Sequence, residues 1–353
     1  MPRSIQEVLA PQTVHHAIAQ IQLPGTSLSR LFGWHLAGTN KTRQSGRNFS
    51  YDIFDNTRLV ATGRVPGQAN SRQAAQSVSA VGGTFPRAAE TIPLLDEELL
   101  NRRDIGGPST QLDHRGESFV TRQEAYLAQR FANLIEFQTA AMIRGTYSYD
   151  EVGDELRHSF AAGETSIDLQ IPAGNKDSLD MLGDGDIISA LWSNAGTDIP
   201  LQVQNINAAL VEKTGLGLAH VVLTGTAWQY VINNTKVQTL GGSDNVPFES
   251  LRRVGPGEFS AVLRAIPWVT FHVIDYGLRV FDGSSVTYTK LIEDDHAAFF
   301  PEVSPRWVQY LEGSEVYAYA FPTHDPSGWE LCAVHNGIPA LYTPDAMAYG
   351  QIA

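Results

Sequence analysis

The clearest periodic segment of the chain lies between residues 119 and 144, where apolar residues recur at intervals of three and four. The spacing predicts a long helix with a buried stripe formed by Leu127, Phe131, Leu134, Ile135 and Met142. Thr121 followed by Glu124 is the pattern of a capping box, and Gly145 is a typical helix stop. About 24 residues at about 1.5 Å each would make a rod of about 36 Å, which is long for a globular protein.

Strand-like patterns lie on both sides of a long polar stretch. Residues 49–62 alternate apolar and polar positions, and residues 84–95 are again extended. The stretch between them is rich in Gly, Ser and Gln and exceeds the ~12 residues usual for loops of compact domains. Two strands joined by such a tip predict a protruding hairpin.

The second half of the chain alternates helical and strand-like segments. The sequence predicts a strand at 164–172, a helix at 198–217 with a glycine stop, a buried strand at 219–225 and a second helix at 226–240. Residues 261–281 are dominated by aromatic and β-branched side chains and predict two strands around a turn. Further short strands are expected over the last 60 residues or so, which makes this half α/β in character.

The first 48 residues have the features of an irregular arm that packs on a folded body. Pro11, Pro24 and several glycines interrupt them, and an isolated apolar and aromatic segment, LSRLFGWHL, follows. Such a segment in polar surroundings usually docks on another surface. We expect the docking residues to be Leu28, Leu31, Phe32 and Trp34.

The composition is that of a folded protein. A length of 353 residues suggests about two folding units, and a hydrophobic content of 42% is enough for a core. No run approaches the ~18 apolar residues of a membrane span, and the first 20 residues lack the apolar core of a secretory signal. The single cysteine, Cys332, lies in an apolar strand-like run, so we expect it to be buried and the protein to occupy a reducing, cytoplasmic compartment.

Charge is distributed unevenly along the chain, whose formal net charge is -13. Between Asp55 and Glu90 there is no acidic residue, whereas this region contains four bases, Arg58, Arg64, Arg72 and Arg87. Residues 150–186 instead hold ten acidic residues against Arg157 and Lys176. The basic hairpin and the acidic block can attract each other within a molecule or between copies, or they can be solvated surfaces that never meet. The net acidity disfavours nucleic-acid binding as the main function.

Two glycine-containing motifs resemble ligand-binding loops only in part. GLGLAH at Gly215 lacks the third glycine of a dinucleotide loop and lies between a helix and a strand in the wrong order, so we interpret it as a helix end. GDGDI at Gly183 lacks the later glutamate of a calcium loop, so we interpret it as an acidic turn.

The best metal candidate is the run that starts at Glu293 and continues with Asp294, Asp295 and His296, although adjacent residues rarely chelate one ion well. The chain contains no GxSxG elbow, no Walker loop and no HExxH motif. We therefore expect no metal, no cofactor and no enzymatic activity. His272 and His335 lie in apolar runs, and we expect both to be structural.

The order of these segments resembles the major capsid proteins of tailed bacteriophages, in particular the lambda-type family called phage major capsid protein E. The resemblance rests on Leu28–Phe32, Thr84–Arg103, the helix Thr121–Arg144 and the ending PDAMAYGQIA. It covers essentially the whole chain as an ordered pattern of elements.

The resemblance implies the α+β shell fold shared by tailed phages and herpesviruses. In that fold an N-terminal arm and an extended loop reach onto neighbouring subunits, a long spine helix lies in a peripheral domain, and an axial domain surrounds the five-fold and six-fold axes. The implied parts are an arm at 1–48, an extended loop at 49–93, a peripheral domain at 94–194 with a spine helix at about 119–144, an axial domain at 195–320, and C-terminal strands at 321–353 that return to the peripheral or axial domain.

The resemblance also implies a function. The chain would be the major head protein of a virion, assembled in the cytoplasm of a bacterial host into pentamers and hexamers of an icosahedral shell. The implied partners are decoration, scaffolding and portal proteins and packaged double-stranded DNA, which is bound without sequence specificity; no membrane is implied. Some shells of this fold cross-link through a loop lysine, but no lysine occurs here between Lys41 and Lys176, so we expect a non-covalent shell.

An uncovered basic loop has a natural target if a neighbouring copy supplies an acidic surface. Our hypothesis places that surface at Asp150, Glu151, Asp154, Glu155, Asp177 and Asp180. Two other functions stay open at this point. The chain could be another self-assembling phage protein or a nanocompartment shell, or it could be a metal-dependent hydrolase that uses the run from Asp294 to His296.

Overall fold

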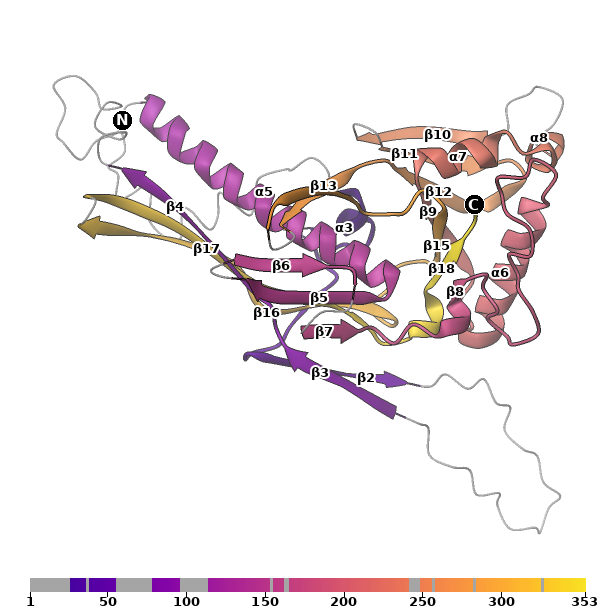
Figure 1. Ribbon diagram of the computed structural model, residues 1–353, viewed down its shortest axis with the longest axis horizontal. Helices are drawn as coiled ribbons and strands as arrows, with labels where there is room; N and C mark the ends of the chain where they lie inside the picture. The colour runs from indigo at the N-terminus through magenta and orange to yellow at the C-terminus, as the bar shows by residue number, and fades with distance from the viewer. Residues whose placement is uncertain are drawn as a thin grey trace, which may run out of the picture. The chain divides into compact units, whose positions relative to one another are not determined.

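The computed structural model describes residues 26–35, 38–54, 78–95, 114–152, 155–161, 165–240, 248–255, 258–281, 284–324 and 327–353 (Figure 1). The chain folds into two compact units, each built from three separate stretches of sequence. Unit 1 comprises Met1–Phe49, Thr84–Gln138 and Tyr310–Pro339, and unit 2 comprises Ser50–Gly83, Thr139–Gln309 and Ala340–Ala353. The five-part division into arm, loop and domains stays a prediction. Among the described helices, none is long and apolar enough to cross a membrane.

Unit 1 is built on a four-stranded sheet with a long helix against one face. The strands lie in the order β1-β16-β17-β4. The bounds are α3 Ser27–Leu31, β1 Lys41–Arg43, β4 Arg87–Leu95, α5 His114–Arg144, β16 Val308–His324 and β17 Ser327–Leu341. The core between helix and sheet consists of Val120, Leu127, Ala128, Phe131 and Ala132 from α5 and Leu94, Val316, Ala318, Leu331 and Ala333 from the strands. Alternate strand residues thus turn toward the helix, as the two-residue period of a strand requires.

The long helix is confirmed, but its predicted start is wrong. It begins at His114, so Thr121 lies inside the helix and does not cap it. Val120 is fully buried in the core of unit 1, and this packing stabilises the extra N-terminal turns. The predicted stop is confirmed, because Gly145 has a φ of 86°, the left-handed conformation that ends helices.

Unit 2 is built on a seven-stranded mixed sheet in the order β10-β11-β12-β9-β15-β18-β8 (Figure 1). The bounds are β8 Lys176–Asp177, α6 Ile199–Thr214, β9 Leu218–Leu223, α7 Gly225–Ile232, α8 Thr235–Leu240, β10 Phe248–Gly255, β11 Glu258–Leu263, β12 Ile266–Ile274, β15 His296–Pro301 and β18 Ala348–Gln351. The core joins the three helices to the sheet, through residues such as Val203, Trp228, Val237, Val221 and Phe271.

The helix and strand predictions for residues 198–223 are confirmed. Asp198 caps α6 by accepting a hydrogen bond from the backbone nitrogen of Leu201, and Gly215 ends this helix with a φ of 77°. β9 lies at the centre of the sheet between β12 and β15. The second predicted helix is in fact two helices, α7 and α8. They are separated at Asn234, whose side chain donates hydrogen bonds to the backbone oxygens of Ala195 and Thr197.

Three smaller sheets complete the described structure. They are β2-β3 (Asn48–Phe54 and Val78–Thr84), β6-β5-β7 (Glu155–Ser159, Thr146–Val152 and Thr165–Asp168) and β13-β14 (Gly277–Phe281 and Val286–Lys290). Two short 3-10 turns, Ala173–Asn175 and Pro344–Ala346, lie in unit 2. β7 confirms the strand predicted at 164–172, although it is shorter.

The hairpin prediction is partly wrong. Its first strand is β2, but the partner of β2 is β3 and not the segment 84–95. That segment becomes β4, which pairs antiparallel with β17 in unit 1. The tip, residues 55–77, lies outside the described residues. The chain therefore leaves the ribbon at about Thr84 and enters another sheet three residues later.

Two further strand predictions need correction. Residues 258–281 form three strands, because β11 and β12 pair as a hairpin whereas β13 pairs with β14 in a separate sheet. The last 60 residues were expected to form short strands, but β16 has 17 residues and β17 has 15. Cys332 is confirmed as buried, with 6% exposure, and lies opposite Thr91 of β4.

Candidate functional site

The predicted docking segment of the arm is fixed to unit 1 by a buried carboxylate. Glu136 of α5 is fully buried, and its two oxygens accept hydrogen bonds from the backbone nitrogens of Leu28 and Ser29, both at 2.8 Å. These nitrogens belong to the first turn of α3, which has no internal partners for them. An ionised acceptor strengthens such hydrogen bonds, so this contact fixes the orientation of α3.

Aromatic packing extends the contact. Phe32 and Trp34 are fully buried, their rings lie 4.9 Å apart, and Trp34 lies 5.6 Å from the ring of Tyr310. Asn40 donates a hydrogen bond to the backbone oxygen of Phe32 at 3.1 Å. Among the predicted docking residues, Leu28, Phe32 and Trp34 are buried and Leu31 is half-buried, and they dock on the same chain. Residues 1–25 of the arm lie outside the described residues.

Tyr310 is the centre of a buried polar network beneath this anchor. Its hydroxyl donates to the side-chain oxygen of Gln138 and lies 3.0 Å from Nε2 of His335, whose ring stacks on the tyrosine. Lys41 forms an ion pair with Glu312 at 2.8 Å, next to the same ring. Burial, helped by the charge of Lys41, lowers the pKa of His335 to about 3. The expectation that His335 is structural fits this neutral, stacked ring.

The basic residues predicted for the extended loop are largely outside the described structure. Arg58, Arg64 and Arg72 lie in the segment 55–77, which is not described. Arg87 is the first residue of β4, where it is exposed and lies opposite Asn336 of β17.

The acidic surface predicted for a neighbour's loop is not one surface. Asp150 is buried, forms an ion pair with Arg157 and accepts a hydrogen bond from the backbone nitrogen of Thr165. Its place in the set is therefore wrong, because its charge is already neutralised inside the sheet β6-β5-β7. Glu151 and Glu155 belong to β5 and β6, but their side chains are not described, and Asp154 lies outside the described residues.

The remaining members lie in an acidic turn formed by residues 177–186. Asp177 is exposed, and Asp180 is half-buried and accepts a hydrogen bond from the backbone nitrogen of Gly185. Gly183 and Gly185 both have positive φ angles, of 76° and 129°, which fits the prediction of a turn. Asp177 also lies 3.9 Å from Nε2 of His296, and contact of this turn with a partner stays a prediction.

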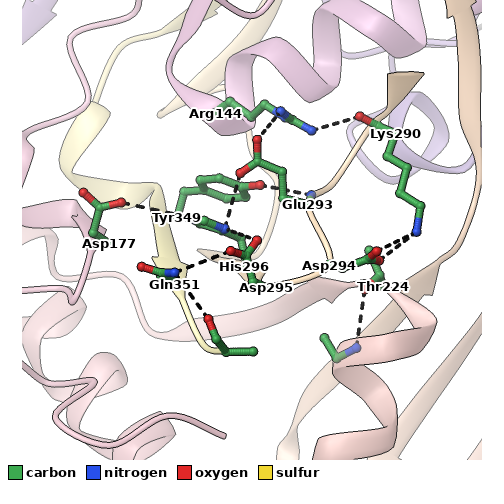
Figure 2. Close-up of polar contacts among 12 residues, drawn as sticks. Arg144, Asp177, Thr224, Lys290, Glu293, Asp294, Asp295, His296, Tyr349 and Gln351 are labelled. Carbon is green, nitrogen blue, oxygen red and sulfur yellow. Dashed lines mark hydrogen bonds and ion pairs between the residues drawn. The ribbon is translucent and has the colours of Figure 1, made fainter. Parts of the chain in front are cut away.

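The metal candidate is a compact cluster at the start of β15 (Figure 2). Glu293, Asp295 and His296 each offer one possible ligand atom, and these three atoms lie within 4.8 Å of one another. Glu293, the first residue of the predicted run, belongs to this cluster, whereas Asp294 does not, because it forms an ion pair with Lys290 at 2.8 Å instead. Nδ1 of His296 lies 2.8 Å from Asp295 and 3.3 Å from Glu293, and its ring stacks on Tyr349.

The donor atoms of this cluster already have partners. Arg144 donates to Glu293 at 2.7 Å and to the backbone oxygens of Lys290 and Leu291. Burial acts to raise the pKa of Asp295, but the hydrogen bond and charge of His296 outweigh it and lower that pKa. A metal ion would have to displace the histidine–aspartate hydrogen bond next to a fixed guanidinium. The geometry fits a charge-balanced network, which joins the end of α5 to β15 and β18, better than a coordination site.

A second histidine cluster was not predicted as a unit. His220 of β9 lies 3.1 Å from His272 of β12 and 3.1 Å from Glu302. Burial lowers the pKa of His272 to about 3, with a smaller contribution from His220. The sequence places both histidines in buried strands, but only the parallel register of β9 and β12 brings them together. Glu136 and Arg144 were also missed, although a charged residue within the apolar stripe of a long helix is a signal of a buried contact.

Comparison with known proteins identifies the fold. No family model and no curated protein matches the chain. Among solved structures, a candidate prophage capsid protein of Escherichia coli CFT073 is similar over 100% of both chains, with a TM-score of 0.59 and 13% identity. A phage-related protein of Bordetella bronchiseptica RB50 is similar over 97% of this chain and 96% of its own, with a TM-score of 0.56 and 11% identity. The chain therefore has the α+β capsid fold of tailed bacteriophages, as the resemblance predicted.

Proposed function

We propose that this chain is a major capsid protein, which self-assembles into the icosahedral shell around the double-stranded DNA of a tailed bacteriophage. The observation that supports this most is the full-length likeness to a candidate prophage capsid protein. The role of the protein is structural and not catalytic. The protein is located in the virion, which is assembled in the bacterial cytoplasm.

The ribbon β2-β3 supports an assembling protein. A two-stranded ribbon is marginally stable alone in water, because it has no second layer to bury its side chains. All residues of β3 except Val81 are exposed. β2 buries Phe49 and Tyr51 on the chain itself, but a neighbouring copy in a shell would cover the exposed side chains of β3. Swapped elements of this kind bury the large areas found in obligate assemblies.

The basic loop contacts an acidic surface on the next copy in this proposal. After the removal of Asp150, the proposed acidic partners are two separate groups. Asp177 and Asp180 belong to the turn 177–186, and Glu151, Asp154 and Glu155 form the other group. The double substitution Arg64→Glu and Arg72→Glu reverses the loop charge and is expected to abolish shells, as judged by electron microscopy. Shells of normal number and size from this variant would contradict the loop contact.

We infer from the order of sequence segments that the chain is a member of the lambda-type family called phage major capsid protein E. Scaffolding, portal and decoration proteins are then the partners of the shell, and the packaged DNA is bound without sequence specificity. The net charge of -13 is consistent with a lining that does not grip phosphate. Because the extended loop has no lysine, the shell is non-covalent, and intact particles boiled in SDS are expected to give a single monomer band.

The experiment that tests the function is electron microscopy of the protein expressed alone, with light scattering on the same sample. Closed shells, rings or tubes of regular subunits are the expected result. Co-expression with scaffolding protein is the second arm, because many shells need a scaffold to close. Monomers in both arms, with one bound metal ion per chain, would overturn the proposal and favour a hydrolase based on the Glu293–His296 cluster.

A further inference from the structure

The seven-stranded sheet of unit 2 has opposite charges at its two edges. Its order places β10 at one edge and β8 at the other, and Figure 1 shows the two strands at opposite ends of the stack. Seven strands are separated by six spacings of about 4.8 Å, so the edges lie about 29 Å apart. Both edges belong to one compact unit, so their distance is fixed by the sheet itself.

The β10 edge combines positive charge with exposed apolar side chains. Arg252 and Arg253 are both exposed, and Leu251 and Val254 beside them are 54% and 52% exposed. Within the described residues, β10 pairs with β11 on one side and with no strand on the other. Arginines alone would protect a free edge from other strands, but large exposed apolar residues next to them are typical of a surface that a partner covers.

The opposite edge has the complementary charge. The turn that follows β8 contains four acidic residues and no base between residues 177 and 186. Hydrogen bonds fix its shape: Ser178 donates to Asp186 at 2.6 Å, and Asp180 accepts from Gly185. Asp184 is exposed, and no hydrogen bond or ion pair joins it to another described residue. Leu182, 39% exposed, adds an apolar contact to this turn.

We propose that the β10 edge of one copy binds the turn 177–186 of the next copy, with Arg252 and Arg253 facing Asp184 and Asp186. This inference rests on the proposed function and specifies a contact within its rings of subunits. Two different surfaces meet, so the contact is head-to-tail, and repetition of such a contact closes into a ring when its rotation allows. A symmetric pairing of two β10 edges would instead place arginine against arginine.

This contact is distinct from the loop contact. The proposed loop partner includes Asp177 and Asp180, whereas the β10 contact uses Asp184 and Asp186, at the tip of the same turn. Charge pairs at a partly desolvated interface influence which partner binds and how fast, and the apolar neighbours contribute buried area.

The test is site-directed cross-linking of the full-length chain with a short bis-maleimide. The variant that combines Arg252→Cys with Asp184→Cys is expected to give a ladder of covalent oligomers on a reducing SDS gel. Each single variant is expected to remain monomeric, because a head-to-tail contact offers only one thiol per interface. These single variants also control for Cys332, which is buried.

A charge-swap series measures the same contact without cross-linker. The pair Arg252→Glu and Arg253→Glu is expected to reduce assembly at least tenfold, and adding Asp184→Lys and Asp186→Lys is expected to restore it. The pair Arg279→Glu and Arg306→Glu, at exposed positions elsewhere in unit 2, makes the same change in net charge and should assemble normally.

The outcomes separate this inference from the proposed function. Normal wild-type particles without a ladder in the double-cysteine variant overturn the β10 contact and leave the capsid function intact. Cross-linked dimers from either single variant overturn the head-to-tail arrangement. A cross-linked ladder without wild-type particles supports the β10 contact and argues against a shell. If neither the ladder nor the particles appear, the result argues against both the β10 contact and the capsid function. A charge-reversal control that fails as badly as the test pair shows a net-charge effect and overturns the contact.

Discussion

The carboxylate of Glu136 accepts a hydrogen bond from the backbone nitrogen of Leu28, 108 residues earlier in the chain, at 2.8 Å. Its other oxygen makes the same contact with Ser29. One fully buried side chain of α5 therefore satisfies two backbone groups at the start of α3. This contact fixes the described end of the N-terminal arm to its own unit, so any reach toward a neighbour has to begin upstream of residue 26.

Replacement of Glu136 by alanine is expected to release the arm. The change removes two hydrogen bonds to a charged acceptor, each of which contributes about 1.5–3 kcal/mol, and leaves two backbone nitrogens without that acceptor. We expect the free energy of unfolding to fall by about 3 kcal/mol, as measured by urea denaturation. Hydrogen exchange at the amides of Leu28 and Ser29 should also accelerate at least tenfold.

The matched control is Glu136→Gln, which keeps one oxygen acceptor and the shape of the side chain. It should lose about half as much stability as the alanine variant. Equal exchange rates at Leu28 in wild type and Glu136→Ala would show that the carboxylate does not hold the arm.

Gly337 is expected to tolerate no side chain. A Cβ atom at this position would lie 2.4 Å from the ring of Tyr310, and that ring is held by Gln138 and His335. Overpacking of this kind costs about 1–3 kcal/mol, so Gly337→Ala should lower the free energy of unfolding by that amount. Gly196→Ala is the control, because its nearest neighbour would lie at an ordinary 3.5 Å. Similar urea midpoints for the two variants would contradict the packing argument.

Local sequence signals predicted the elements whose causes are local. The body of α5, the glycine stop of α6 and the strand β9 follow from apolar spacing and from glycines at helix ends. The errors arise where tertiary contacts decide. The break between α7 and α8 depends on Asn234 reaching two backbone oxygens about 40 residues away, and the length of β16 and β17 depends on their pairing partners.

The candidate sites were less predictable for the same reason. The apolar docking residues of the arm were recognisable because they interrupt a polar stretch. For Glu136, the position of a charged residue in an apolar stripe signals a buried contact. Its partners could not be identified, because they are distant in sequence and use backbone atoms, which leave no trace in residue type. Asp150 was assigned to a surface by charge counting, and only the pairing of β5 with β6 and β7 brings it to Arg157 and Thr165.

Glu124 is expected to make the protein less stable as the pH rises. Burial raises the pKa of this carboxyl to about 7 from its ordinary value of 4.5. The folded state then binds more protons than the unfolded state between these values, so stability falls as the pH rises from about 4.5 to 7 and stays lower above it. Glu124→Gln should therefore exceed wild type in unfolding free energy by about 2 kcal/mol at pH 8 and by much less at pH 5. The exposed Glu212→Gln is the control, and a pH-independent difference would contradict the assignment.

His335 is expected to act in the opposite direction. Its pKa in the folded state, about 3, lies below the ordinary 6.5, so the unfolded state binds more protons and stability falls as the pH decreases from about 6.5 toward 3. Between pH 7 and pH 5 this group alone costs at most about 2 kcal/mol. His335→Phe keeps a ring stacked on Tyr310 and should lose correspondingly less stability over that range. The exposed His324→Phe is the control, and parallel pH profiles for wild type and His335→Phe would refute the prediction.

Chelation is expected to leave the stability of the protein unchanged. In the cluster of Glu293, Asp295 and His296, one carboxylate is bound by Arg144 and the histidine nitrogen is bound by Asp295, so the network is balanced without a metal. We expect the same melting temperature with and without EDTA, and well below one equivalent of zinc by elemental analysis. Arg144→Ala should instead destabilise the protein in both conditions, because it leaves the carboxylate and two backbone oxygens without their donor. A lower melting temperature on chelation of the wild-type protein, together with one metal ion per chain, would mean that the cluster is a metal site.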